Sequence, residues 1–374
     1  MFEMAGATTK KSLATLRFVT KLQPEGAAPM RHNGTAGLIA SVCGLATAIS
    51  ATPALATSFN YTSLAPHSNS ARDSFATGVN ASDTVAGYFY CCASPTISTI
   101  WPPGTQFGYI VKKDNTQFTA INASGYAAAT AYPNTGKIGG YVFNTNIVSS
   151  SDYTKIVLPG KDQVYPLAIN ASGEVSGYIT KSTTSSSAFV ASGATATLLK
   201  VPGVGKFSYA YGINDSGTVV GNYVAKHGGL THGFTYNAGT YTSFDPPGST
   251  NTAPAFVTNS GAIGGSFTDG AGTHGFTLVG TTYTTVDFPA ATSTKVIGIC
   301  PSGEVIGNFV DSTSNTHGFS LQGGTYYQID EPSGVTTTLT GVSPLGSLIG
   351  DYIDSSGYTN AFIAQCPAGD SPCT

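Results

Sequence analysis

The chain has 374 residues, of which only 9% are charged, and a formal net charge of −3. Residues 1–56 carry a net +3, so the remainder carries −6. A chain this acidic and this poor in lysine and arginine lacks the basic surface that nucleic-acid binding requires. Glycine, serine, threonine, tyrosine and phenylalanine are abundant, which is typical of many short strands and tight turns, and no pattern is long enough for a helical domain.

The N-terminal segment has the features of an export signal. Arg31 and His32 precede an uncharged, mostly small and apolar run at residues 35–49, and Ala54-Leu55-Ala56 matches a small-x-small cleavage site. We therefore predict a leader at 1–56, with Met30 as its natural start and cleavage after Ala56, and an extracellular, periplasmic or cell-surface location. The run is too short and too polar to span a bilayer comfortably. The alternative is an amphipathic tail with no sorting role.

Residues 57–374 form one domain built from a repeated four-stranded meander. In the clearest copy the expected strands are residues 210–213, 218–223, 232–236 and 240–245, and Asn214-Asp215-Ser216-Gly217 is a type I turn between the first two. Matching turns are 170–173, 258–261, 300–303 and 343–346, with 80–83 and 133–136 as irregular copies. A further glycine follows each turn four residues later: Gly87, Gly140, Gly177, Gly221, Gly265, Gly307 and Gly350.

The spacing of these glycines is close to the length of one propeller blade. A fourth-strand pattern occurs before the first turn, at residues 59–64, and is missing after the last third strand at 361–363. A closed ring explains this if the first strand completes the last repeat, and closure also removes exposed sheet edges. We predict an all-β, seven-bladed β-propeller of four-stranded blades, closed by the N-terminal strand completing the last blade. The second repeat fits least well, because its 37-residue step leaves little room for a third strand between Tyr141 and Tyr153.

His232, His274 and His317 each begin a His-Gly-Phe triplet. Equivalent side chains on separate blades are related by rotation and do not converge on one ion, so we expect structural hydrogen bonds rather than a metal site. The recurring Asp245, Asp287 and Asp330 are expected to cap the loops that follow them.

Five cysteines remain after cleavage of the leader, so at least one thiol is expected to be unpaired: Cys91, Cys92, Cys300, Cys366 and Cys373. Cys366 and Cys373 could form a disulfide that fixes the C-terminal tail, whereas Cys300 is expected to be a small, partly buried turn residue. No metal and no cofactor are predicted.

The units 212–223, His-Gly-Phe and 241–248 resemble the bacterial extracellular HAF-repeat family, which is named for a His-Ala-Phe triplet. Glycine replaces the alanine in the three copies that carry histidine, whereas Ser187-Ala188-Phe189 and Asn360-Ala361-Phe362 keep Ala-Phe without histidine. The resemblance covers essentially all of 57–374. It implies export and a repeated β architecture, and it supplies no catalytic residues.

Residues that break the repeat are more informative about function than those that obey it. In a meander, the loops between second and third strands and the crossings between blades share one face, and we expect a ligand site there. The longest insertion, residues 91–104, carries the only tryptophan, which could be exposed for glycan stacking or could cover a blade edge. The candidate binding residues on this face are Trp101, His67, Arg72, Asp73, Lys161, Asp162, Lys226, His227 and Glu331.

The leading hypothesis is a secreted or surface-associated, monomeric, non-catalytic protein that binds a glycan or another extracellular partner, with no transmembrane segment. It rests on the lack of a Ser-His-Asp order, a phosphate loop and a metal cluster in the sequence. One alternative is a propeller hydrolase or lyase that acts on polysaccharide through Asp73, Asp162 and Glu331 with His67 or His227. Another is a structural envelope or matrix protein.

Overall fold

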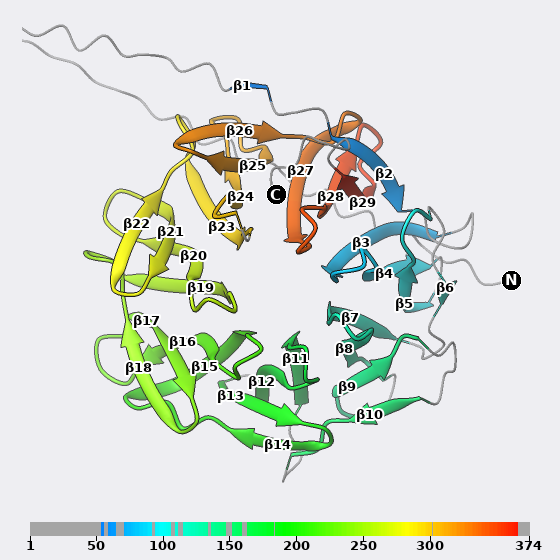
Figure 1. Ribbon diagram of the computed structural model, residues 1–374. Helices are drawn as coiled ribbons and strands as arrows, with labels where there is room; N and C mark the ends of the chain where they lie inside the picture. Colours follow the sequence, from blue (N-terminus) through cyan, green and yellow to red (C-terminus); the bar gives the residue numbers. More distant parts are fainter. Residues whose placement is uncertain are drawn as a thin grey trace, which may run out of the picture. The chain divides into compact units, whose positions relative to one another are not determined.

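Within the described residues every regular element is a β-strand (Figure 1). The computed structural model describes residues 54–55, 59–64, 71–91, 94–105, 109–110, 115–133, 136–146, 152–158, 163–182, 184–300 and 302–365. The predicted leader and its cleavage site, apart from the strand at 54–55, lie outside this description.

Antiparallel pairing sorts the strands into groups of four, which we number in chain order. The first group is β3 (Ala71–Val79), β4 (Val85–Cys91), β5 (Ser94–Trp101) and β6 (Tyr109–Ile110). The second is β7 (Thr116–Ile121), β8 (Tyr126–Ala131), β9 (Gly139–Asn144) and β10 (Tyr153–Lys155), and the third is β11 (Gln163–Ile169), β12 (Val175–Ser182), β13 (Ser185–Ser192) and β14 (Thr195–Leu198).

The fourth group is β15 (Val204–Ile213), β16 (Val219–Ala225), β17 (Thr231–Asn237) and β18 (Thr240–Phe244), and the fifth is β19 (Asn251–Val257), β20 (Ile263–Thr268), β21 (Thr273–Val279) and β22 (Thr282–Val286). The sixth is β23 (Ser293–Ile299), β24 (Val305–Val310), β25 (Thr316–Gln322) and β26 (Thr325–Ile329). Single parallel pairs, Thr231 with Asn251 and Thr273 with Ser293, link these three groups, and β1 (Ala54–Leu55) adds to β26 in parallel.

The last group combines the two ends of the array. It contains β27 (Gly334–Val342), β28 (Leu348–Asp354), β29 (Thr359–Gln365) and the N-terminal β2 (Asn60–Leu64), which pairs antiparallel with β29. This pairing agrees with the prediction that the N-terminal strand completes the C-terminal repeat. In Figure 1 the first strands of the groups (β3, β7, β11, β15, β19, β23 and β27) lie innermost, and the fourth strands lie outermost.

In six of the seven groups, the glycine that follows the first turn by four residues is required for steric reasons. The first strand of every group carries a β-bulge directly opposite this position, as between Ala210 and Gly212 opposite Gly221. A Cβ atom on Gly221 would lie 2.0 Å from the Tyr209 carbonyl oxygen and 2.8 Å from the ring of Phe234. Glycine therefore lets the bulged strand and the aromatic ring of the third strand approach from two sides.

The second group corrects the predicted repeat boundaries. Its first turn is Asn122-Ala123-Ser124-Gly125, which joins β7 to β8, rather than 133–136. Ala129 occupies the place of the second glycine opposite the bulge, and Gly140 lies in the third strand. The 37-residue step was a false alignment, produced because alanine replaces the glycine that marks every other copy.

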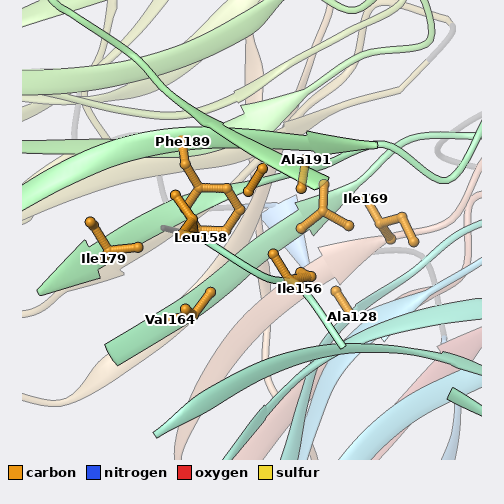
Figure 2. Close-up of a cluster of buried hydrophobic side chains, with 10 residues drawn as sticks. Ala128, Ile156, Leu158, Val164, Ile169, Ile179, Phe189 and Ala191 are labelled. Carbon is orange, nitrogen blue, oxygen red and sulfur yellow. The ribbon is translucent and has the colours of Figure 1, made fainter. Parts of the chain in front are cut away.

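The core lies between neighbouring groups rather than at one centre. In Figure 2, Phe189, Val164 and Ile179 of the third group meet Ile156 and Leu158, which follow β10 of the second. The third-strand phenylalanines Phe189, Phe234, Phe276, Phe319 and Phe362 are all fully buried. Burying such rings from water between adjacent sheets is the main apolar contribution to stability.

We predict that Gly221→Ala destabilises the fold, because the methyl group collides with a backbone oxygen that cannot rotate away. The expected loss is about 1–3 kcal/mol or more in the free energy of unfolding, measured by chemical denaturation. Gly270→Ala is the control, because a Cβ there meets nothing within 4 Å. Equal stability of the two variants would contradict the steric explanation.

Candidate functional site

Asparagine side chains connect the first turns of successive groups. The amide nitrogen Nδ2 of Asn80 donates to the Asn122 carbonyl oxygen at 3.2 Å, and Asn122 Nδ2 donates to the Asn170 carbonyl oxygen at 2.9 Å. The series continues from Asn170 to the Asn214 carbonyl oxygen and from Asn214 to the Thr258 carbonyl oxygen. These four side chains are at most 5% exposed, so each amide is a buried hydrogen-bonding group that holds one sheet to the next.

The same asparagines fix their own turns. The Oδ1 atom of Asn214 accepts hydrogen bonds from the backbone N–H groups of Ser216 and Thr218, at 3.2 and 2.9 Å. This is an Asx turn, in which the side chain replaces a backbone acceptor. The series stops at the fifth, sixth and seventh groups, where Thr258, Cys300 and Ser343 take the position. There Ser343 bonds instead to Asp83 of the first group, at 2.8 Å.

The turns surround a central cavity of about 410 Å³. Every four-stranded group contributes the last residue of its first strand, always valine or isoleucine, and these side chains give the cavity an apolar wall: Val79, Ile121, Ile169, Ile213, Val257, Ile299 and Val342. The second turn residues form its rim. There Asp215 accepts from Ala171 N–H and from Asn259 Nδ2, at 2.8 and 2.6 Å.

This cavity lies at the end of the sheets opposite to the predicted face. We name the surface formed by the first turns the turn face. The cavity's amide groups are already engaged, since Asn80, Asn122, Asn170 and Asn214 use both amide atoms within the fold. Chemically, the cavity is an apolar well with a polar rim.

Trp101 is a core residue, which rules out the exposed stacking ring and agrees with the alternative that the ring covers a blade edge. Residues 94–101 form strand β5 rather than a loop insertion, and Trp101 pairs with Val85 at the turn end of the sheet. Its side chain is 0% exposed and packs with Leu64, Ile349 and neighbours between the first and last groups. Its ring fills the space above Gly87, where Thr99 stands in place of the phenylalanine of five other groups and the Tyr141 of the second.

Among the other predicted site residues that the structure describes, Asp73 and Glu331 each bond to the backbone of the fold rather than to one another. Asp73 Oδ1 accepts the Thr359 N–H at 2.8 Å, and Glu331 is 8% exposed with Oε2 accepting the Ser333 N–H at 2.6 Å. Burial raises the pKa of Glu331, opposed by hydrogen bonds from Ser333 and Gly334. Lys226 and His227 are exposed in the loop after β16. His67, Lys161, Asp162 and the Arg72 side chain lie outside the described residues.

The structure pairs each triplet histidine with the recurring aspartate, in agreement with the expected structural hydrogen bonds. His232 Nδ1 lies 2.6 Å from Asp245, and His317 Nδ1 lies 2.9 Å from Asp330. His274 contacts Asp287 at 2.9 Å and Asp269 at 3.3 Å. Burial alone lowers the pKa of His274, but the hydrogen bond and charge of Asp287, together with Asp269, outweigh it and raise that pKa. The pairs tie the third strand to the end of the fourth.

Cys300 is a buried turn residue, 3% exposed, and it is also disulfide-bonded, which the sequence did not predict. The predicted Cys366–Cys373 disulfide lies outside the described residues. Within the described part of the chain, no group of three or more histidine, cysteine or acidic side chains could hold a metal ion. Among those residues, no helix is long and apolar enough to cross a membrane.

The asparagine bridges were missed by the sequence reasoning, although the signal was present. Asparagine opens four turns at the same repeat position, and the turn itself requires only a small polar residue there. A preference for asparagine over serine or aspartate is explained by a side chain that must both accept and donate. That second requirement comes from the neighbouring sheet.

No protein-family model matches the sequence, and no curated protein matches it. Among solved structures, Pyrococcus horikoshii acylaminoacyl peptidase matches with a TM-score of 0.55 and 10% identity over 78% of this chain and 51% of that one. YCF48 bound to D1 peptide matches with a TM-score of 0.50 and 12% identity over 83% and 96%. The chain spans about half the length of the peptidases it matches. At these identities the likeness shows the fold alone, which is of β-propeller type.

We predict that Asn214→Asp destabilises the protein by about 1–3 kcal/mol at neutral pH. The turn keeps its acceptor, but a carboxylate oxygen replaces the donor that faces the Thr258 carbonyl oxygen. Chemical denaturation measures the loss. Asn237→Asp is the control, since Asn237 is exposed and contacts the same turn through Thr218; its change should stay within about 0.5 kcal/mol. Matching losses would contradict the bridging role.

We also predict a pH-dependent seam between the last and first groups. Burial raises the pKa of Asp351 to about 7, and its hydrogen bond from the Ala76 N–H (2.9 Å) opposes the shift. Because the folded-state pKa exceeds the unfolded value, the native state retains a proton that the unfolded chain releases. The contribution of Asp351 to the free energy of unfolding is therefore fully present below about pH 4, and it is lost as the pH rises to about 7.

Asp351→Asn tests this seam, because Asn308 at the equivalent position bonds both the N–H and the carbonyl oxygen of Leu339. The variant should melt at a higher temperature than wild type at pH 8, and this advantage should shrink toward pH 4. Burial also raises the pKa of Glu304 to about 7. Because Glu304 is present in both proteins, its effect cancels in the difference between their melting temperatures. Parallel melting profiles across this range would show that Asp351 does not titrate as described.

Proposed function

We propose that the chain is an exported, closed seven-bladed β-propeller that binds carbohydrate at its turn face without catalysing a reaction. The observation that supports this proposal most directly is the central cavity. It is lined by first-turn residues from every four-stranded group. Hydrogen bonds between the last and first groups support closure. Thr340 Oγ1 donates to the Ala76 carbonyl oxygen at 2.7 Å, and the Ala361 N–H donates to Ser74 Oγ at 2.9 Å. The proposal of export and of an extracellular location rests on the predicted signal and on the HAF-repeat resemblance.

The engagement of the acids and histidines supports binding over catalysis. General acid–base chemistry needs a titratable group that can reach a substrate proton. Asp73, Asp83 and Glu331 each accept hydrogen bonds from the fold itself, and the triplet histidines are held by aspartates. These contacts give each group a structural task.

The surface chemistry supports a neutral, hydroxyl-rich ligand. Few residues are charged, so long-range attraction to a polyanion or an acidic membrane has little source. Large exposed side chains include Tyr90, Tyr126, Tyr153 and Tyr358. Tyrosine combines an apolar face with a hydrogen-bonding hydroxyl, which suits the alternating C–H and O–H faces of a sugar ring. This favours carbohydrate over nucleic acid or lipid.

A glycan array probed with the full chain tests the proposal. We expect retention on neutral glycans that changes little with ionic strength, because the contacts are not ion pairs, and no release of reducing ends from the bound polysaccharide. Release of reducing ends would establish the hydrolase alternative. Retention on no glycan, or concentration-dependent self-assembly without one, would reject carbohydrate binding.

A further inference from the structure

A second cavity of about 280 Å³ lies between the second and third groups, beside the central one. Its walls come from the start of β8, the end of β9, the start of β10 and two turns of the third group. We call it the Tyr126 groove, defined by Tyr126, Val142, Asn144, Asp152, Tyr153, Thr154, residues 171–173 and Gly193. Ala171 also lines the central cavity, so both hollows open on the turn face.

Two residues of the groove depart from the repeat. In the second group, the residue whose carbonyl oxygen closes the first turn is Tyr126. The corresponding residues in the other groups are smaller or acidic: Thr84, Glu174, Thr218, Ala262, Glu304 and Ser347. The residue that opens the fourth strand is threonine in the third to sixth groups and Asn60 in the last. The second group has Asp152 immediately before β10 at this place. Repeat architecture explains neither residue, yet both face one groove.

The groove presents aromatic surface that is held in place. Tyr126 is 40% exposed and Tyr153 is 37% exposed. The Tyr153 ring packs against Tyr141 and Phe143, with ring centroids 5.3 and 5.4 Å away. Its position is therefore fixed before a ligand arrives, which lowers the entropy lost on binding.

The groove also differs from the central cavity in its polar groups. Asn144 uses Oδ1 to accept the Asn146 N–H at 3.1 Å, and no hydrogen bond to another described residue engages its Nδ2, which can donate to a ligand. Within the described residues, no hydrogen bond engages the Asp152 carboxylate or the Tyr126 hydroxyl. A carboxylate and an amide beside aromatic rings can bond adjacent hydroxyl groups while the rings cover the C–H face of the sugar.

We propose that the Tyr126 groove is a subsite for one or two sugar rings of a neutral glycan, an inference that rests on the carbohydrate-binding function proposed above. Its volume lies just below the range of about 300–1,000 Å³ of pockets for drug-sized ligands, which suits a unit of this size. Tyr126 and Tyr153 stack on the sugar, and Asp152 and Asn144 bond its hydroxyl groups. The shared wall at Ala171 lets a longer chain continue toward the central cavity.

The test measures affinity by titration calorimetry with cellohexaose, maltohexaose and mannohexaose on the full chain. We expect Tyr126→Ala and Asp152→Ala each to weaken binding of the retained probe about tenfold, as loss of one stacking or hydrogen-bonding contact does. Tyr126→Phe should keep most of the stacking contribution. Tyr358→Ala is the matched control, because Tyr358 is 42% exposed and lies outside the groove, and it should bind as wild type does.

The outcomes separate the two proposals. Wild-type binding that both groove variants preserve would overturn the groove and leave the function in place, with Asp215→Ala then locating the site at the rim of the central cavity. Binding of no probe by the wild type, together with no retention on the array, would overturn both. Thermal melting of each variant shows whether it is folded, and little change is expected at these exposed positions.

Discussion

The structure depends on an asparagine amide that performs two tasks at once. Its oxygen closes the turn between the first and second strands, and its nitrogen donates to the same turn in the next sheet. Elsewhere neighbouring sheets meet largely through apolar side chains, such as the phenylalanines of the third strands, together with single hydrogen bonds such as that from the Ala76 N–H to Asp351. A buried hydrogen bond has a defined geometry and a cost when broken. The bridges therefore fix the rotation between successive sheets from the first group to the fifth and bring these turns together around the cavity.

Close approach is the second constraint. A bulge in each first strand directs a carbonyl oxygen at the second strand, and a buried ring covers the same spot from the other side. Glycine at that point admits both in six of the groups, and Ala129 takes its place in the second. The first group varies in another way, because Thr99 lies where five groups have phenylalanine and the second has Tyr141, and the Trp101 ring fills the space over Gly87 instead. The same change of residue explains why the single tryptophan is in the core rather than in a binding site.

The polar groups on the turn face have two kinds of role: some bond within the fold, and others lie in the groove that is proposed to bind a ligand. Around the central cavity the amides and the Asp215 carboxylate bond within the fold, so the cavity is mainly where the sheets converge. The Tyr126 groove lies beside it and presents side chains that the repeat does not require. A repeated scaffold with one unit modified by a few residues is consistent with recognition localised to one inter-sheet groove, and this is the basis of the proposed sugar subsite.

By itself, the sequence determined the strands and turns, the four-stranded unit and the pairing of β2 with β29, because turn chemistry and strand alternation are local properties that repeat along the chain. It misplaced the second repeat, where Ala129 replaces the marker glycine, and it placed the expected ligand face at the end of the sheets opposite to the central cavity. It left open whether Trp101 is exposed or covers a blade edge, and it did not predict the disulfide of Cys300. Only the tertiary structure decided these points. Burial of a ring, convergence of turns on a cavity and the meeting of Tyr126 with Asp152 depend on neighbours that are distant along the chain.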